Sequence, residues 1–148
     1  MSVIVKDNGF GIKNIIINEP ETYNSLSFKT LNILINIFRR LENDNKTRVI
    51  ILSGNGKGFS AGHNLKEVKN LKVRSKYLKL FNLCSKLMLN IVEGRKPVIA
   101  KVHGSAFAAG CQLAASCDLA YASIDAKFAT PGVNIGLFCS TPMVAVSR

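Results

Sequence analysis

The sequence lacks any apolar run long enough to cross a membrane. A spanning helix needs about 20 consecutive apolar residues, and Lys, Arg, Asn or Asp interrupts every hydrophobic stretch of this chain. The first residues, Met1 to Asp7, contain neither a basic segment followed by an apolar one nor an Arg- and Ser-rich presequence. From these absences we expect no membrane partner and a cytoplasmic location.

Cysteine motifs are lacking as well. The four cysteines form no C-x-x-C pair and have no histidine at zinc-finger spacing, so the sequence predicts no metal site. Each lies among apolar or small residues, where a reduced thiol behaves as a small hydrophobic side chain. These residues are Cys84, Cys111, Cys117 and Cys139.

Acidic residues are scarce: 9 Asp and Glu stand against 20 Lys and Arg, which gives a net charge of +11. Many of the basic residues recur between Lys66 and Lys86, interleaved with apolar residues. A solvated helix face explains this pattern, and a rim that attracts the phosphates of a nucleotide-containing ligand is the alternative. Nucleic acid is not an expected partner, because no set of aromatic stacking residues accompanies the charge.

Alternating strand and helix patterns predict an α/β fold. β-branched runs at 13–18 and 48–52 read as buried strands, and between them Ser27 can cap a helix with apolar residues at helical spacing. A second helix pattern at 77–91 is followed by strands at 97–102 and 119–123. Without linkers or repeats, the 148 residues suit a single domain over residues 1–148.

A further helix start is present near the end of the sequence, where Ser140, Thr141 and Pro142 offer a cap and a first-turn proline. A helix of about two turns is marginal by itself. We therefore expect the natural fold to continue past Arg148 and the domain to be truncated.

Two loops of small residues, 54–64 and 104–112, each follow a strand and precede a helix pattern. Neither matches a Walker A motif or a G-x-G-x-x-G fingerprint. Small residues let a ligand approach the backbone, and the first N–H groups of a helix lack internal acceptors. If the two loops converge, two backbone amides can hold one oxygen atom and stabilise negative charge on it.

The segments Gly58–Leu65 and His103–Asp118 resemble the two oxyanion-hole signatures of the enoyl-CoA hydratase/isomerase (crotonase) superfamily, in the same order and spacing. Pro20–Leu26 is similar to the early proline-containing turn of that family, and the likeness runs from about Ile15 to the last residue. The stretch Phe128–Pro142 resembles one subgroup of the family in particular.

The resemblance implies a crotonase-like spiral of ββα units, with the carboxy-terminal helices missing. It also implies an acyl-CoA thioester as ligand, in fatty-acid metabolism, with coenzyme A as part of the substrate and no separate cofactor. Full-length members are expected to form homotrimers or hexamers, and a missing carboxy-terminal fragment is a further candidate partner.

Carried over residue by residue, the resemblance assigns the two backbone donors to Ala61 and Ala109. It places Gly62, His63 and Asn64 along the path of the thioester and pantetheine. Gly110 and Gly132 complete the predicted substrate-binding residues.

The two catalytic glutamates of family hydratases correspond here to Gln112 and Gly132, so ordinary hydration of an enoyl-CoA is not expected. Gln112 remains available to orient a water or a carbonyl group. His63 is the nearest titratable alternative, although a pocket-lining role is the simpler interpretation. His103 is expected to be packed or bonded to backbone, and Asp118 to brace its loop. The alternative function is a noncatalytic remnant or interaction fragment.

Overall fold

We describe the chain from a computed structural model, which covers residues 1–136 and 138–147. Leu137, which belongs to the predicted subgroup motif, and Arg148, the last residue of the predicted domain, lie outside the described residues. Within the described residues, none of the helices combines the length and the apolar character that a membrane span requires.

The main sheet has five strands in the order β1-β2-β3-β5-β7. β1 (Val3–Asp7) is antiparallel to β2 (Ile12–Ile17), and β3 (Val49–Gly54), β5 (Val98–Val102) and β7 (Leu119–Ala122) continue the sheet in parallel. The β-branched runs predicted as strands therefore form its centre, because side chains such as Ile15 and Leu52 are fully buried there.

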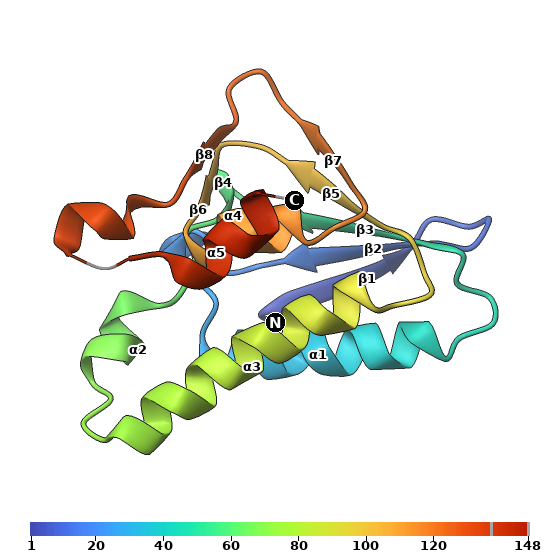
Figure 1. The fold of residues 1–148 in the computed structure, drawn as a ribbon. Coiled ribbons are helices and arrows are strands. Elements are labelled where there is room, and N and C mark those ends of the chain that lie inside the picture. Colours follow the sequence, from blue (N-terminus) through green and yellow to red (C-terminus); the bar gives the residue numbers. More distant parts are fainter. Residues whose placement is uncertain (137, 148) are drawn as a thin grey trace.

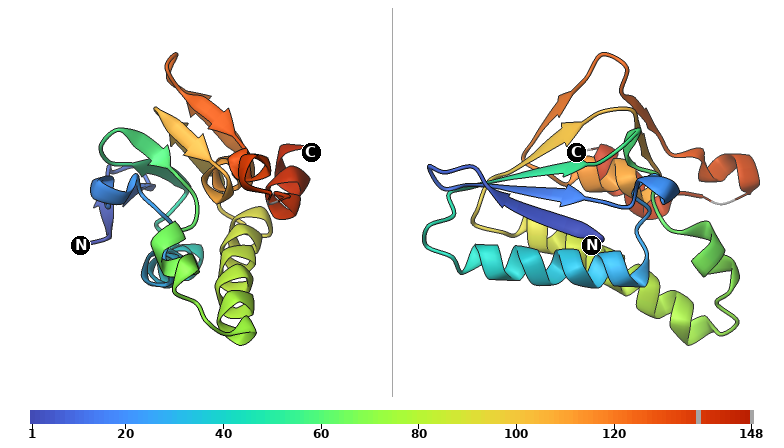
Figure 2. Two further views of the ribbon diagram at one scale, coloured as in Figure 1. Left: turned by 90° about the vertical axis from the view of Figure 1, so that its left-hand side faces the viewer. Right: turned by 180° about the vertical axis from the view of Figure 1, so that it is seen from behind.

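Two long helices, α1 (Phe28–Glu42) and α3 (Arg74–Val92), lie side by side against one face of this sheet (Figures 1 and 2). Ser27 caps α1, since its hydroxyl accepts a hydrogen bond from the Thr30 N–H at 3.1 Å, as the sequence predicted. The apolar stripe of each helix packs into the core through residues such as Leu34 and Leu87.

A second, smaller sheet contains three parallel strands of three residues each: β4 (Gly58–Ser60), β6 (Ser105–Phe107) and β8 (Lys127–Ala129). Each of these strands follows a strand of the main sheet along the chain. The units are β3-β4, then α2 (Leu65–Lys69) and α3, and β5-β6, then α4 (Ala109–Ala115).

The third unit runs from β7 and β8 through η2 (Pro131–Ile135) to α5 (Ser140–Val146), which lies beside α4. The repeated ββα arrangement confirms the predicted α/β class. A short helical turn, η1 (Pro20–Thr22), occupies the proline-containing segment between β2 and α1.

The sequence patterns missed β1 and the strands of the small sheet, whereas α2 forms where a helix start was expected after the first loop. Residues 104–110 were expected to be a loop, but 105–107 form the central strand β6. Three-residue strands carry almost no periodic signal, and they exist here because neighbouring segments pair with them, as Ala106 does with Phe128.

Candidate functional site

The two small-residue loops lie directly against each other, which is the condition that the sequence analysis set for a shared oxygen site. Gly62 has a φ of +86°, and a side chain at this position would place its Cβ 2.9 Å from the carbonyl oxygen of Phe107 and 3.0 Å from the amide nitrogen of Ala109. At Gly110 an added Cβ would lie 2.2 Å from the carbonyl oxygen of Ser60. Backbone therefore packs on backbone at both glycines, and no side chain fits between the loops.

The hydrogen bonds of the first loop identify which of its amides is free. The Ala61 N–H donates to the carbonyl of Tyr23 at 2.9 Å, and the Gly62 N–H donates to the hydroxyl of Ser60 at 3.3 Å. Within residues 1–136 and 138–147, the N–H of His63 has no acceptor. The assignment of the first donor to Ala61 conflicts with the pairing of that amide, whose single hydrogen atom is already used.

In the second loop, Ala109 is the first residue of α4, so its N–H has no acceptor inside the helix. Ala109 and Gly110 are both buried. The preceding Ala108 has a φ of +48° and donates its own N–H to the carbonyl of Ala129 in the neighbouring strand β8. This strained residue turns the chain from β6 into α4 and brings the Ala109 amide beside Gly62.

The imidazole of His63 is held between two neighbours. Its Nδ1 lies 3.4 Å from the carbonyl oxygen of Leu26, and its ring meets the ring of Phe81 edge to face at a centroid distance of 5.3 Å. Burial lowers the pKa of His63 below its ordinary value, while the contact with the Leu26 carbonyl opposes that shift. A lowered pKa favours the neutral form of the ring at pH 7.

Asn64 acts as a helix cap. Its side-chain oxygen accepts a hydrogen bond from the Glu67 N–H at 3.1 Å and so begins α2. The Glu67 carboxylate in turn accepts from the Phe28 N–H at 3.0 Å, which ties α2 to the start of α1. The polar group of Asn64 is thus engaged in local structure.

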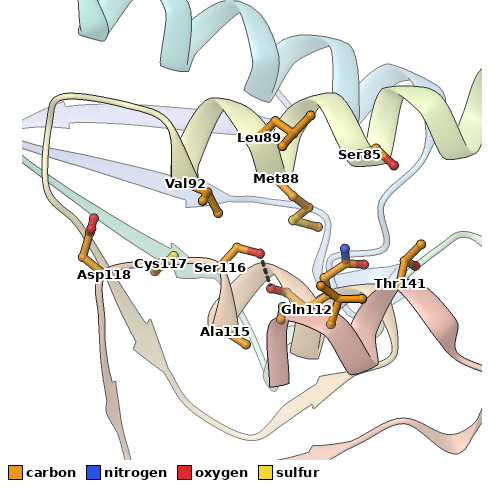
Figure 3. A pocket seen from close by; sticks show the side chains of 12 residues that line it. Ser85, Met88, Leu89, Val92, Gln112, Ala115, Ser116, Cys117, Asp118 and Thr141 are labelled. Carbon is orange, nitrogen blue, oxygen red and sulfur yellow. Dashed lines mark hydrogen bonds between the residues drawn. The ribbon is translucent and has the colours of Figure 1, made fainter. Parts of the chain in front are cut away.

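Gln112 projects from α4 into an open groove of about 470 Å³ between α3, α4 and α5 (Figure 3). The residue is only 7% exposed, and its side-chain oxygen has no hydrogen-bond partner among the described residues. The groove lining includes Met88, Ser116 and Thr141. Gly132, the counterpart of the second family glutamate, is buried in η2 and is not part of this lining.

Two other polar residues of the second motif are structural, as predicted. His103 places Nε2 2.7 Å from the carbonyl oxygen of Gly56, which joins the two loops at their outer end. The Asp118 carboxylate accepts a hydrogen bond from the Val98 N–H at 2.7 Å and braces the chain before β7. Among the described residues, neither side chain forms a hydrogen bond with Gly62 or Gly110.

Asn24 has a structural role that no sequence pattern indicated. Its side-chain nitrogen donates to the carbonyls of Asn55 at 2.7 Å and Gly58 at 2.8 Å, and its side-chain oxygen accepts from the Glu19 N–H at 2.9 Å. The residue is fully buried, with a φ of +55°. Asn24 therefore holds the first loop in place. In the sequence, only its position in the proline-containing turn could have pointed to a structural role.

No group of three or more His, Cys, Asp or Glu side chains that could hold a metal ion occurs in the part of the chain that the structure describes. The four cysteines, described in the same residues, are all free thiols. Burial raises the pKa of Cys84 to about 12. For Cys117, burial and the neighbouring Asp118 carboxylate raise the pKa to about 12.

Comparison with known proteins identifies relatives of this architecture. The family described as enoyl-CoA hydratase/isomerase matches residues 7–146. The human mitochondrial enoyl-CoA hydratase domain-containing protein 3 is 49% identical over 138 residues, which are 93% of this chain and 46% of the relative. Its counterpart from Xenopus laevis is also 49% identical, over 93% of this chain and 47% of that protein.

Solved structures agree with the sequence relatives. A structure of an enoyl-CoA hydratase from Mycobacterium smegmatis superimposes with a TM-score of 0.97 at 46% identity, over 100% of this chain and 58% of that one. The human enoyl-CoA hydratase domain-containing protein 3 gives a TM-score of 0.94 at 45% identity, with the same two shares. The chain thus spans about half the length of its curated relatives.

The expected cytoplasmic location is contradicted by these relatives, because the enoyl-CoA hydratase domain-containing proteins 3 from human, Xenopus laevis and rat are named as mitochondrial. The expectation relied on Met1 to Asp7, and these residues lead into and form β1 of the folded sheet. They therefore carry no information about targeting. The matched residues, the ββα architecture and the two abutting loops together establish that the chain belongs to the enoyl-CoA hydratase/isomerase family.

Proposed function

We propose that this chain binds acyl-CoA thioesters, with the thioester carbonyl oxygen accepting hydrogen bonds from the backbone amides of His63 and Ala109. The contact between Gly62 and the Ala109 amide supports the proposal, because Gly62 directly precedes His63 and lies against the second loop. The N–H groups of His63 and Ala109 both lack a backbone acceptor among the described residues. Ala61, which the family resemblance suggested as first donor, is replaced by His63 because its N–H is already paired with Tyr23.

Two amides in this arrangement suit a carbonyl better than they suit water. An unpaired buried N–H costs about 1–3 kcal/mol, and a ligand oxygen removes that cost. Negative charge on the oxygen, as in an enolate or a tetrahedral intermediate, strengthens both hydrogen bonds without any rearrangement of the backbone. The site therefore polarises a thioester once it has bound it.

The basic segment around α2 and the start of α3 suits the phosphates of coenzyme A. Six cations lie on this segment, all with exposed side chains, and acidic residues there are few. Such a surface attracts an anionic ligand more strongly at low salt than at high salt. The residues are Lys66, Lys69, Lys72, Arg74, Lys76 and Lys79.

We do not expect the ordinary hydratase reaction. Adding water across the enoyl double bond requires a base for the water and an acid for the α-carbon. A carboxamide at Gln112 cannot titrate, Gly132 has no side chain, and His63 faces the Leu26 carbonyl and the Phe81 ring. Loss of the conjugated thioester absorbance of crotonyl-CoA should therefore stay at the background rate when this chain is added.

Isothermal titration with matched ligands tests the binding proposal. Butyryl-CoA carries the thioester carbonyl, whereas the thioether S-butyl-CoA replaces that carbonyl by a methylene and keeps the rest of the molecule. We expect the thioester to bind at least tenfold more tightly, since two hydrogen bonds of about 1 kcal/mol each are at stake. Equal affinity for the two ligands, or no binding of either, would contradict the proposal.

A further inference from the structure

Two Asn-Gly pairs, Asn8-Gly9 and Asn55-Gly56, lie in exposed turns. The first turn joins β1 to β2 and the second joins β3 to β4, and the two glycines have positive φ values of +76° and +82°. Glycine has no side chain to shield its backbone nitrogen, so this nitrogen can attack the carboxamide of the preceding asparagine. By exposure and backbone conformation alone, the two pairs would react equally.

The structure holds the Asn55 carboxamide beside the nitrogen of Gly56. Its Oδ1 accepts a hydrogen bond from the Gly56 N–H at 2.9 Å, and its Nδ2 donates to Oδ1 of Asn18 at 2.7 Å. The main chain of Asn55 is held as well, because its N–H donates to the Ile17 carbonyl at 2.8 Å and its carbonyl accepts from Asn24 Nδ2 at 2.7 Å. Because Oδ1 is bonded to Cγ, the Gly56 nitrogen stays within reach of the carbon that it would attack.

At Asn8 the corresponding nitrogen is directed toward a different residue. The Gly9 N–H donates to Oδ1 of Asp7 at 2.9 Å. Asp7 also forms an ion pair with Lys13, which helps to hold this carboxylate in the turn. A negative charge beside the Gly9 N–H opposes the loss of its proton, so formation of the nucleophile is disfavoured there. Asn8 is therefore exposed but not aligned for attack.

The reaction that this alignment favours consumes only water. Solvent hydroxide removes the proton of the Gly56 N–H, and the nitrogen attacks Cγ of Asn55. The Cγ–Nδ2 bond then breaks, and the released nitrogen takes a proton from solvent and leaves as ammonia, which gives a cyclic imide. Water opens this imide at either carbonyl carbon. Residue 55 becomes aspartate if the new Cγ–N bond breaks, and isoaspartate if the original peptide bond breaks.

We infer that Asn55 is a site of spontaneous deamidation in the folded chain and that Asn8 is protected from it. The isoaspartate product changes the first loop. Its main chain runs through Cβ and Cγ, so the former backbone carbonyl of residue 55 becomes a carboxylate beside Asn24. The extra main-chain atom also displaces the Gly56 carbonyl, which lies 2.7 Å from Nε2 of His103. Deamidation at Asn55 therefore alters two of the contacts that position this loop.

Peptide mapping by mass spectrometry tests the inference. Trypsin places the two asparagines in separate peptides, residues 7–13 and 49–57, and neither peptide contains another asparagine. The 148-residue chain is incubated in mildly alkaline buffer, and conversion of both asparagines is followed in the same sample. We expect Asn55 to deamidate about tenfold faster than Asn8 in the folded chain. In urea, where both turns are unfolded, the two rates should agree within about twofold.

The Asn18→Ala variant removes the acceptor for Nδ2 of Asn55 and leaves both Asn-Gly pairs unchanged. The released carboxamide should leave its aligned position, so deamidation of Asn55 should slow about tenfold. Asn8 in the same sample is the control, and its rate should not change.

Three outcomes would overturn the inference. Asn8 could convert as fast as Asn55, or faster, in the folded chain. The preference for Asn55 could persist in urea, which would assign it to the local sequence and not to the fold. The Asn55 rate could stay unchanged or rise in Asn18→Ala. If Asn18→Ala fails to fold, as judged by circular dichroism, the comparison of folded and urea-unfolded wild type decides by itself.

Discussion

At the scale of single residues, the candidate site depends on positions where a side chain is excluded. Gly62 is the clearest case, because its added Cβ would meet the Phe107 carbonyl and the Ala109 amide at once. The neighbouring residues Ala61 and His63 differ in one respect that matters for binding. The N–H of Ala61 donates a hydrogen bond to the carbonyl of Tyr23, whereas the N–H of His63 has no acceptor among the described residues.

The Gly62→Ala substitution should reduce thioester binding. The new methyl group has to displace the Ala109 amide from the loop, so we expect butyryl-CoA affinity to fall at least tenfold in isothermal titration. Gly9→Ala is the matched control: Gly9 also has a positive φ, of +76°, but its added Cβ meets nothing within 4 Å. Both variants carry a similar backbone strain of about 1 kcal/mol, and only Gly62→Ala should lose affinity. Similar losses in both would refute the assigned contact.

The buried imidazole of His63 predicts a pH dependence of stability. Its pKa is lowered in the folded protein, so the unfolded chain binds a proton first as the pH falls below about 6.5. The contribution of His63 is therefore fully present at neutral pH and is lost on acidification. Urea unfolding at pH 7 and pH 5.5 should show a larger loss for the wild type than for His63→Phe. An identical loss of stability in both proteins would show that His63 does not contribute to the pH dependence.

Two thiols with raised pKa values, one buried and one partly buried, give a third test at this scale. Because burial raises the pKa of Cys84 and Cys117 to about 12, both remain protonated near pH 8. Labelling with a disulfide reagent should modify them only after unfolding in urea. Mass spectrometry of tryptic peptides identifies the labelled positions, and rapid modification of either thiol in the folded chain would disprove the prediction.

At the scale of secondary-structure elements, α2 is a five-residue helix that depends on its cap. The Asn64 side chain begins it, and Glu67 connects it to the start of α1. Isolated helices of this length are unstable in water, so the contacts at its ends decide whether it forms. This matters for the site because Asn64 directly follows the proposed donor His63.

Removing that cap should destabilise the protein measurably. We expect Asn64→Ala to lower the free energy of unfolding by about 1 kcal/mol, because the Glu67 N–H then loses its acceptor. Asn82→Ala, on the exposed face of α3, is the control and should change the free energy by less than about 0.5 kcal/mol. Equal effects in urea unfolding would show that the cap contributes nothing.

At the scale of the whole molecule, a large apolar surface is uncovered. Exposed apolar side chains lie on α3, β7 and α5, among them Leu89, Val92, Tyr121 and Val144. Patches of this kind mark interaction surfaces or aggregation sites in soluble proteins. The relatives are about twice as long as this chain, and their additional residues are candidates to cover this apolar surface.

We accordingly expect the 148-residue chain to self-associate when it is produced alone. Size-exclusion chromatography with light scattering should give a mass above that of the monomer at micromolar concentration, and association should increase with salt as charge repulsion between the basic chains is screened. A stable monomer at every salt concentration would contradict this expectation.

The sequence by itself determined the features that are encoded locally. Helical spacing and the Ser27 cap predicted α1, β-branched runs predicted β2 and β3, and the glycine-rich loops with their family resemblance located the candidate site. Such features arise from residues within a few positions of one another, so a single sequence is enough to recognise them.

Only the tertiary structure decided which groups are free to bind. The Ala61 amide is paired because Tyr23 lies against it. The side-chain oxygen of Gln112 has no partner among the described residues, because α3 and α5 present mainly apolar side chains to the groove. Hydrogen-bond satisfaction depends on contacts between segments distant in sequence. Local sequence patterns do not reveal these contacts. Only the folded structure shows which amides are already hydrogen-bonded within the protein and which are free to bind a ligand.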